Sequence, residues 1–185
     1  MRILTQIFLL SILLSCGQED SSKTQGLATP TQEAPREQQN PLKELELVTP
    51  NRERIKTELA YTREEKNMGL QGVRDEDFDE NQGKLFFYHT DSTRTFWMPN
   101  TFFDLHIFYL DKNLTITDIA WNVPHYSGNV ASLIPRAPAV SSRYVLEMKA
   151  SSTIASKLRE GDSLSWQSTL TYEETEEGLR NLHGR

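Results

Sequence analysis

Short segments of β-strand character recur from residue 54 to residue 170, and they limit the possible folds more than any other feature. Arg54–Tyr61 alternates apolar and polar side chains, which is typical of a strand with one buried face. The other segments are short and rich in β-branched and aromatic residues: Lys84–His89, Thr93–Met98, Leu105–Leu110, Leu114–Trp121, Arg143–Met148 and Ser163–Leu170. Strands and helices do not alternate regularly, which argues against a parallel α/β sheet. We therefore predict a mostly-β fold, either a small sandwich or a barrel.

Two short helices are expected beside these strands. Thr62–Glu65 has the form of a capping box and opens a helix that ends by Gly69 or Gly72. Ser152 is suited to cap a second helix, which runs through Leu158 and stops at Gly161. Asp111–Asn113 predicts a tight turn between two strands.

The amino-terminal segment has the features of an export signal. Arg2 provides a positive start, and the apolar run Ile3–Leu14 is shorter than the roughly twenty residues of a membrane-spanning helix. The run ends in Leu13–Cys16, which resembles a lipobox, and Cys16 is the only cysteine of the chain. The resemblance implies that Cys16 is lipidated and becomes the first residue. Two or three acyl chains would form a stable anchor. Gly17, in place of aspartate, favours the outer membrane of a bacterial envelope over the inner one.

The chain divides into four predicted parts. A signal peptide (1–15) precedes lipidated Cys16 and a tether (16–44) that is rich in Gln, Glu, Ser, Thr and Pro, a composition typical of disorder. The folded domain follows (45–172), and residues 173–185 form a frayed or weakly helical tail.

The formal net charge of −6 restricts the partners. An acidic chain without a basic run lacks the electrostatic attraction that dominates binding to nucleic acid. An anionic bilayer would repel the domain, so membrane contact is expected through the lipid anchor alone.

Several ordered motifs resemble the domain-of-unknown-function family numbered 192. They are Thr62–Glu65, Gly69-Leu70, Gly83–Phe86, Phe96–Thr101, Leu105–Asp111, Tyr144–Glu147 and Gly161-Asp162. The resemblance covers about residues 53–170 and implies a small jelly-roll-like sandwich. It implies no activity, because none is established for the family. The chain departs from the family pattern at Gln71–Arg74, at Pro99 and at Asp104–His106.

Phe96–Thr101 is the first candidate site. In a strand, Phe96 and Met98 would face one side and Trp97 the other. Trp97 would then offer a flat face to a sugar or peptide ring, and Asn100 and Thr101 would supply hydrogen bonds. The alternative is structural, with a buried Trp97 and a turn after Pro99.

Glu147 is the second candidate. Arg143–Met148 predicts Arg143 and Glu147 on one strand face, where Glu147 would accept a hydrogen bond from a ligand or act as a general base. The structural alternative is an ion pair with Arg143 or with Arg74.

His125 lies in the polar loop 122–131 and is the histidine expected nearest to a site. No pair of histidines has metal-ligand spacing, so we predict neither a metal nor a cofactor.

Three functions follow from these candidates. The first is a non-enzymatic module that binds a small polar or saccharide ligand through Trp97, Asn100, Thr101, His125, Glu147 and Arg74. The second is a structural or accessory lipoprotein that binds a protein partner of the envelope. The third is an uncharacterised hydrolase, which would need His125, Glu147 and another acid to converge.

Inhibition of the lipoprotein signal peptidase tests the predicted anchor. Cells that express the chain should accumulate a larger precursor because cleavage before Cys16 is blocked, and gel electrophoresis would detect the change in size. A Cys16→Ser chain is the control and should give the same precursor without inhibitor. An unchanged band in treated cells contradicts lipidation.

Overall fold

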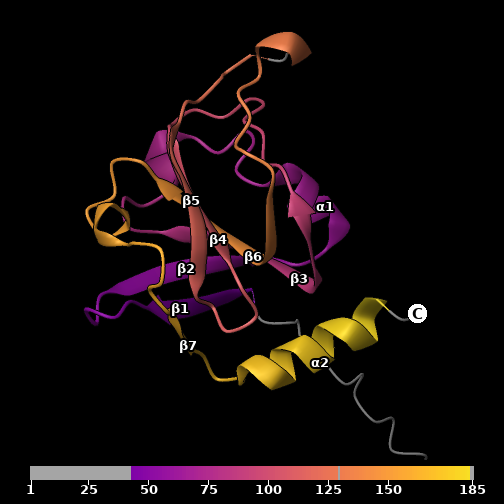
Figure 1. The fold of residues 1–185 in the computed structure, drawn as a ribbon. Coiled ribbons are helices and arrows are strands. Elements are labelled where there is room, and N and C mark those ends of the chain that lie inside the picture. Colours follow the sequence, from indigo (N-terminus) through magenta and orange to yellow (C-terminus); the bar gives the residue numbers. More distant parts are fainter. Residues whose placement is uncertain (1–42, 129, 184–185) are drawn as a thin grey trace, which may run out of the picture. The chain divides into compact units, whose positions relative to one another are not determined.

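The computed structural model describes residues 43–128 and 130–183. Seven strands form one sheet in the order β5-β4-β6-β3-β2-β1-β7 (Figure 1). They are β1 (Glu44–Val48), β2 (Arg54–Ala60), β3 (Gly83–Arg94), β4 (Leu105–Leu110), β5 (Ile116–Val123), β6 (Val140–Lys149) and β7 (Ser165–Gln167). Strands β2 and β3 pair in parallel, and the other neighbours are antiparallel. The helices are α1 (Arg63–Met68) and α2 (Tyr172–His183), with 3₁₀ turns η1 (Asp75–Asp77), η2 (Ala131–Leu133) and η3 (Ala155–Lys157).

The sheet curls until its two edges meet at one end. Thr115 and Ser163 form a bridge between the start of β5 and the segment before β7. Beside this bridge, the Ile116 N–H donates to the Asp162 carbonyl (2.9 Å) and the Leu164 N–H donates to the Leu114 carbonyl (3.0 Å). The mostly-β prediction is confirmed. Of its two forms, the barrel is closer than a sandwich, because one partly closed sheet replaces two facing ones.

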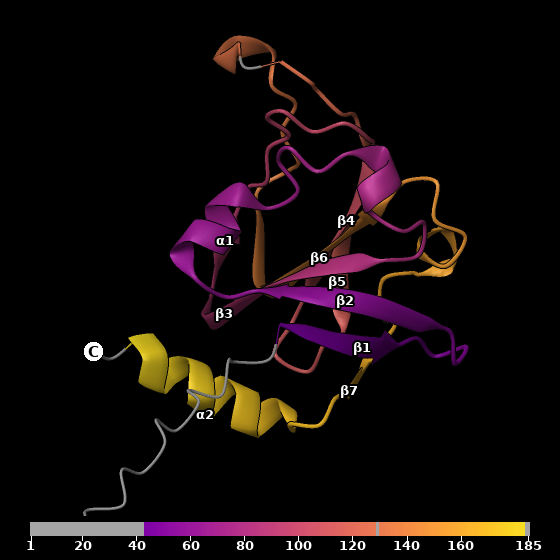
Figure 2. The same ribbon diagram turned by 180° about the vertical axis from the view of Figure 1, so that it is seen from behind.

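Each face of the sheet carries its own core. The inner face of the curl is covered by a cluster that includes Phe87, Phe108 and Leu146. The outer face carries a second cluster that includes Phe86 and Val145, together with Leu70 and Phe78 from the connection between β2 and β3. Helices α1 and α2 lie on opposite sides of the sheet, as Figures 1 and 2 show. Central strands are therefore buried on both faces, which explains their continuous apolar runs.

The predicted capping box is confirmed. Thr62 Oγ1 accepts a hydrogen bond from the Glu65 N–H, and the Glu65 carboxylate accepts one from the Thr62 N–H, both at 3.1 Å. Helix α1 ends at Met68 and is capped by Gly69, whose φ of +51° is disfavoured for other residues. The Asp111–Asn113 turn is also confirmed, since Asp111 Oδ1 accepts from the Asn113 N–H at 2.8 Å.

Ser152 caps a shorter element than predicted. Its Oγ accepts from the Ala155 N–H (3.1 Å), but only the three-residue turn η3 follows, so the predicted helix through Leu158 is wrong. Two of the predicted strands, Lys84–His89 and Thr93–Met98, are also largely one element. Strand β3 covers the first and the start of the second, with a register shift against β6 between Phe87 and Ser92. A β-bulge here lets one strand continue through the polar residues between the two apolar segments. The apolar pattern alone predicts a break between two strands at this point.

The predicted signal peptide, Cys16 and all but the end of the tether lie outside the described residues. Within the described part of the chain, no helix has the length and apolar character needed to cross a membrane. The division into four parts stays a prediction.

Helix α2 spans the predicted border between domain and tail. Its Leu179 is 1% exposed and belongs to the inner cluster, and Tyr172 packs against the same cluster. The described part of the predicted tail is therefore helical and contributes to the core. The amphipathic spacing of Tyr172, Thr175 and Leu179 produces this packing.

Leu179→Ala should lower the free energy of unfolding by about 2–4 kcal/mol, because it removes a buried side chain and leaves a cavity. Urea unfolding followed by circular dichroism measures the change. Glu177→Ala, an exposed position on the same helix, should change the value by less than about 0.5 kcal/mol. Equal stability of both variants would show that α2 does not belong to the cooperative core.

Candidate functional site

Glu147 is a carboxyl in the middle of the sheet. It lies on β6 between β3 and β4, opposite Lys84 on one side and Ile107 on the other. Alternation along β6 directs Tyr144, Leu146 and Met148 to the inner cluster, which leaves Glu147 on the outer face. Because the outer face is covered as well, Glu147 is only 4% exposed.

This buried carboxyl lacks a partner. Lys84 is its cross-strand neighbour, but the Lys84 ammonium bonds to Glu58 at 3.2 Å. Among residues 43–128 and 130–183, no hydrogen bond or ion pair reaches the Glu147 carboxyl. Burial raises the pKa of Glu147 to about 8, and the nearby charge of Lys84 opposes the rise only in part. The group is therefore largely protonated at neutral pH.

The two ion pairs considered for Glu147 do not form. Arg143 bonds instead to Asp91 (2.9 Å) and approaches Glu176 (3.8 Å). Arg74 is exposed and precedes η1. The structural interpretation of Glu147 as half of a salt bridge is therefore wrong, and the carboxyl is left to face the space beside it.

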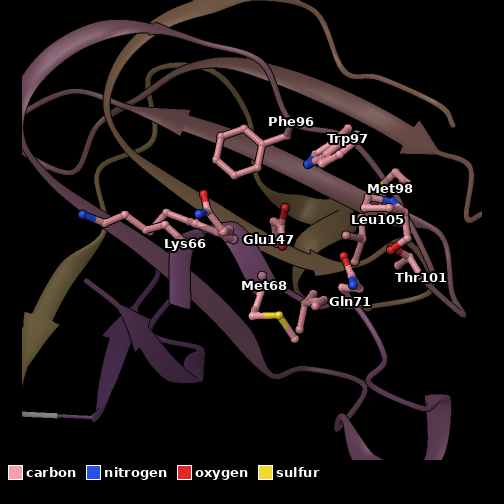
Figure 3. Close-up of a pocket in the computed structure, with 14 residues that line it drawn as sticks. Lys66, Met68, Gln71, Phe96, Trp97, Met98, Thr101, Leu105 and Glu147 are labelled. Atoms are coloured by element: carbon pink, nitrogen blue, oxygen red, sulfur yellow. The ribbon is translucent and has the colours of Figure 1, made fainter. Parts of the chain in front are cut away.

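That space is a small pocket between α1, the Phe96–Thr101 loop and the sheet (Figure 3). Its lining includes Lys66, Gly69, Phe86, Trp97, Thr101 and Glu147. The pocket has a volume of about 30 Å³ for water-sized groups, which is enough for about two water molecules. The pocket therefore admits a hydroxyl or another small polar group, and a sugar ring would have to remain outside.

Gly69 keeps this pocket open. A Cβ at this position would come within 3.3 Å of the Phe86 ring and 4.0 Å of Glu147 Oε2. A side chain here would therefore press on the Phe86 ring and come into contact with the carboxyl. The left-handed end of α1 and the space beside Glu147 depend on the same glycine.

Trp97 stands at the mouth of the pocket and is 46% exposed, whereas Phe96 and Met98 are 8% and 1% exposed. The predicted division of faces is confirmed, and the interpretation of Trp97 as a core residue is wrong. Backbone hydrogen bonds hold the segment: the Met98 N–H donates to the Pro135 carbonyl (3.1 Å), and the Ala137 N–H donates to the Phe96 carbonyl (2.8 Å). The indole is thus presented from an anchored backbone.

Thr101 lines the pocket but is 3% exposed, and its hydroxyl donates to the Pro99 carbonyl at 3.2 Å. Asn100 does not line the pocket. It has a φ of 48° and joins two loops, since its carbonyl accepts from the Gly72 N–H at 2.9 Å. The predicted turn after Pro99 is confirmed, and the structural role explains both residues.

His125 is separate from this pocket. Its Nδ1 lies 2.7 Å from Asp104 Oδ1, which also accepts the His125 backbone N–H at 2.8 Å. These hydrogen bonds lower the pKa of Asp104. Of the six predicted ligand residues, Trp97, Thr101 and Glu147 come together, whereas Asn100, His125 and Arg74 do not line the pocket. In the described part of the chain, no three His, Cys, Asp or Glu side chains form a group able to hold a metal.

Three residues that no sequence motif indicated lie together beside the pocket: Lys66, Tyr88 and Arg94. Lys66 lines the pocket itself, and all three line a groove that adjoins it. The Arg94 guanidinium lies 3.6 Å from the centre of the Tyr88 ring, and Lys66 Nζ lies 4.5 Å from it. Two of these residues belong to β3 and the third to α1. No local motif signals their meeting, because it requires the parallel crossover from β2 to β3.

Together these features define a partly closed β-barrel domain with a buried carboxyl on its outer face, beneath an exposed indole. The sequence model of the DUF192 family, described as "Uncharacterized ACR", matches residues 46–166. The chain belongs to this family, which confirms the resemblance found in the sequence.

Two crystal structures share the fold. One, from Sinorhizobium meliloti 1021 and provisionally described as a transcription regulator, has 25% identity and a TM-score of 0.53, covering 66% of this chain and 92% of its own. The other, a protein of unknown function from Novosphingobium aromaticivorans DSM 12444, has 24% identity and a TM-score of 0.52, covering 66% of this chain and 84% of its own. No curated protein matches the chain.

The stability of a Glu147→Gln variant should reveal the raised pKa. Between pH 5 and about 8 the folded carboxyl keeps a proton that the unfolded chain has released, so a rising pH destabilises the wild type. The variant has no such proton, so its free energy of unfolding should rise relative to that of the wild type by up to about 1.4 kcal/mol per pH unit.

Urea unfolding at several pH values measures this difference. Glu80→Gln, at an exposed position, controls for a surface substitution and should run parallel to the wild type. A constant difference between Glu147→Gln and the wild type over this range would refute protonation of the buried carboxyl.

Proposed function

We propose that the chain is a membrane-anchored lipoprotein whose domain binds a small polar or saccharide ligand without transforming it. The observation that carries the proposal is the joint position of Trp97 and Glu147 in one pocket. An exposed aromatic face above a buried polar group is the usual combination in sites for small polar ligands.

Glu147 supports ligand binding through its lack of a partner. No hydrogen bond from the described residues reaches its carboxyl, so the group is open to a ligand hydroxyl that enters the pocket. A protonated carboxyl offers both a donor and an acceptor, which suits a hydroxyl that can act in both ways. The pocket volume of about 30 Å³ allows one such group to enter.

Trp97 supports ligand binding at the mouth of the same pocket. Its indole is 46% exposed, and the Arg136 guanidinium lies 5.4 Å from its centre. A sugar ring whose hydroxyl reaches Glu147 would lie against the indole, which supplies apolar contact at little cost in side-chain entropy. The anchored backbone reduces that cost further.

Binding is favoured over hydrolysis because Glu147 is the only carboxyl among the residues that line the pocket. A glycosidase of the usual type needs two carboxyls about 5–10 Å apart across the scissile bond. His125, the predicted third member of a catalytic group, is engaged with Asp104 instead.

A protein partner is the second candidate. Val130 and Leu133 are 53% and 62% exposed at η2, which projects from the sheet in Figure 1. These side chains are few, and Trp97 is exposed within a pocket rather than buried, which favours the small ligand.

A binding screen of neutral sugars and small polar metabolites against the full chain in non-ionic detergent tests the proposal. Ligands found by calorimetry should bind at least about tenfold more weakly to Trp97→Ala, a loss of about 1.4 kcal/mol. Trp121→Ala is the matched control, because Trp121 is 42% exposed and does not line the pocket.

Thermal unfolding of both variants separates loss of binding from loss of fold. If folded Trp97→Ala binds as tightly as the wild type, or if Trp121→Ala loses binding equally, the proposed site is refuted.

A further inference from the structure

A wider groove adjoins the Glu147 pocket and has an unusual charge. It has about 540 Å³ of room and shares Lys66 and Trp97 with the pocket. Its lining contains three cations, Arg63, Lys66 and Arg94, and no carboxylate. The whole chain has a net charge of −6, so the charge of the groove is opposite in sign to that of the chain.

The cations converge on one aromatic ring. Arg94 and Lys66 lie 3.6 Å and 4.5 Å from the centre of the Tyr88 ring. The ring stabilises each cation in part, but the two charges repel each other. Burial, and then the charge of Arg94, lower the pKa of Lys66 to about 8.

The nearby carboxylates are already engaged. Asp91 attracts Arg94, yet it accepts a hydrogen bond from Arg143 at 2.9 Å. Glu65, next to Lys66 in the chain, bonds to Lys43 and closes the capping box. In the described ranges, no ion pair neutralises Lys66 or Arg94.

Arg94 also keeps unused hydrogen-bonding capacity. Nη2 donates to the Thr90 carbonyl at 2.6 Å. No hydrogen bond to the described residues engages the other terminal nitrogen, whereas Nε is buried without a partner there and does not face solvent. A guanidinium with one uncommitted terminal nitrogen near an ammonium is a common arrangement for an oxyanion.

We propose that this groove binds an oxyanion carried by the same ligand, so that the ligand is a small acidic ring compound such as an acidic sugar. The inference rests on the proposed function, because it places the ring against Trp97. Arg94 and Lys66 hold the oxyanion, Tyr88 and Trp97 flank the apolar part, and a hydroxyl reaches toward Glu147. Carboxylate and phosphate share this chemistry.

Glucuronate, glucose 6-phosphate and glucose distinguish these cases, with acetate and inorganic phosphate as anions that lack a ring. Calorimetry on the full chain in non-ionic detergent should show at least one acidic sugar binding about tenfold or more tightly than glucose. The preference should shrink as salt rises from about 50 to about 500 mM, because screening weakens the attraction. The preferred acid identifies carboxylate or phosphate as the natural group.

Arg94→Gln and Lys66→Gln should each reduce this preference by about fivefold or more. Arg94→Gln should also leave glucose binding unchanged, because Arg94 does not line the Glu147 pocket. Arg94→Lys keeps the charge and should retain part of the preference, which guards against a fold defect in Arg94→Gln. Lys112→Gln, an exposed lysine in the turn after β4, is the matched control and should have no effect.

Different failures have different meanings. Equal affinity for glucose and both acids, with all binding lost in Trp97→Ala, overturns the oxyanion inference and leaves the proposed function intact. Acid binding that depends on Arg94 but not on Trp97 or Glu147 overturns the proposed site and the shared ligand. Absence of binding by every acidic probe at millimolar concentration overturns the inference.

Discussion

Burial of β6 on both faces is the constraint on which the rest of the structure depends. The curl of the sheet encloses one face of this strand, and the connection that carries α1 covers the other. From Tyr144 to Lys149 every side chain of the strand is buried, because neither face is open to water there. Val145 fits this requirement, whereas Glu147 two residues later does not. The carboxyl is held in the covered outer layer by the same ladder that fixes its neighbours.

The free-energy cost of burying the Glu147 carboxyl is connected with the features around it. Gly69 leaves room beside the Phe86 ring and Glu147 Oε2, since a Cβ there would press on the ring and contact the carboxyl. Lys84, the nearest cation across the ladder, is directed to Glu58 instead. A protonated group avoids most of the penalty of a buried charge, yet it still lacks hydrogen bonds. A polar group in a covered layer contributes little to stability, and this is the physical ground on which Glu147 is proposed as a binding group.

The local electrostatics differ from those of the whole molecule. Net charge predicts repulsion of anions, but the crossover from β2 to β3 brings Lys66 beside Arg94 in a groove whose lining lacks carboxylates. Ligands respond to the field in the cleft that they enter, and low-dielectric walls strengthen that field. The family is described only as uncharacterized, so the function proposed for this chain rests on the arrangement of these side chains.

Much of this protein was readable from local sequence, because the interactions involved span only a few residues. The Thr62–Glu65 capping box, the Asp111–Asn113 turn and the alternation that separates Trp97 from Phe96 were all predicted correctly. The mostly-β class followed from the same periodicity, and the family followed from the order of its motifs.

The tertiary structure decided which of these side chains meet. It joined two predicted strands into β3, packed Leu179 into the core, and separated His125 and Arg74 from Glu147. It also assembled Lys66, Tyr88 and Arg94 across a parallel crossover. Contacts between residues far apart in the chain depend on strand order and sheet curvature, which are set by the packing of the whole domain and leave no local pattern.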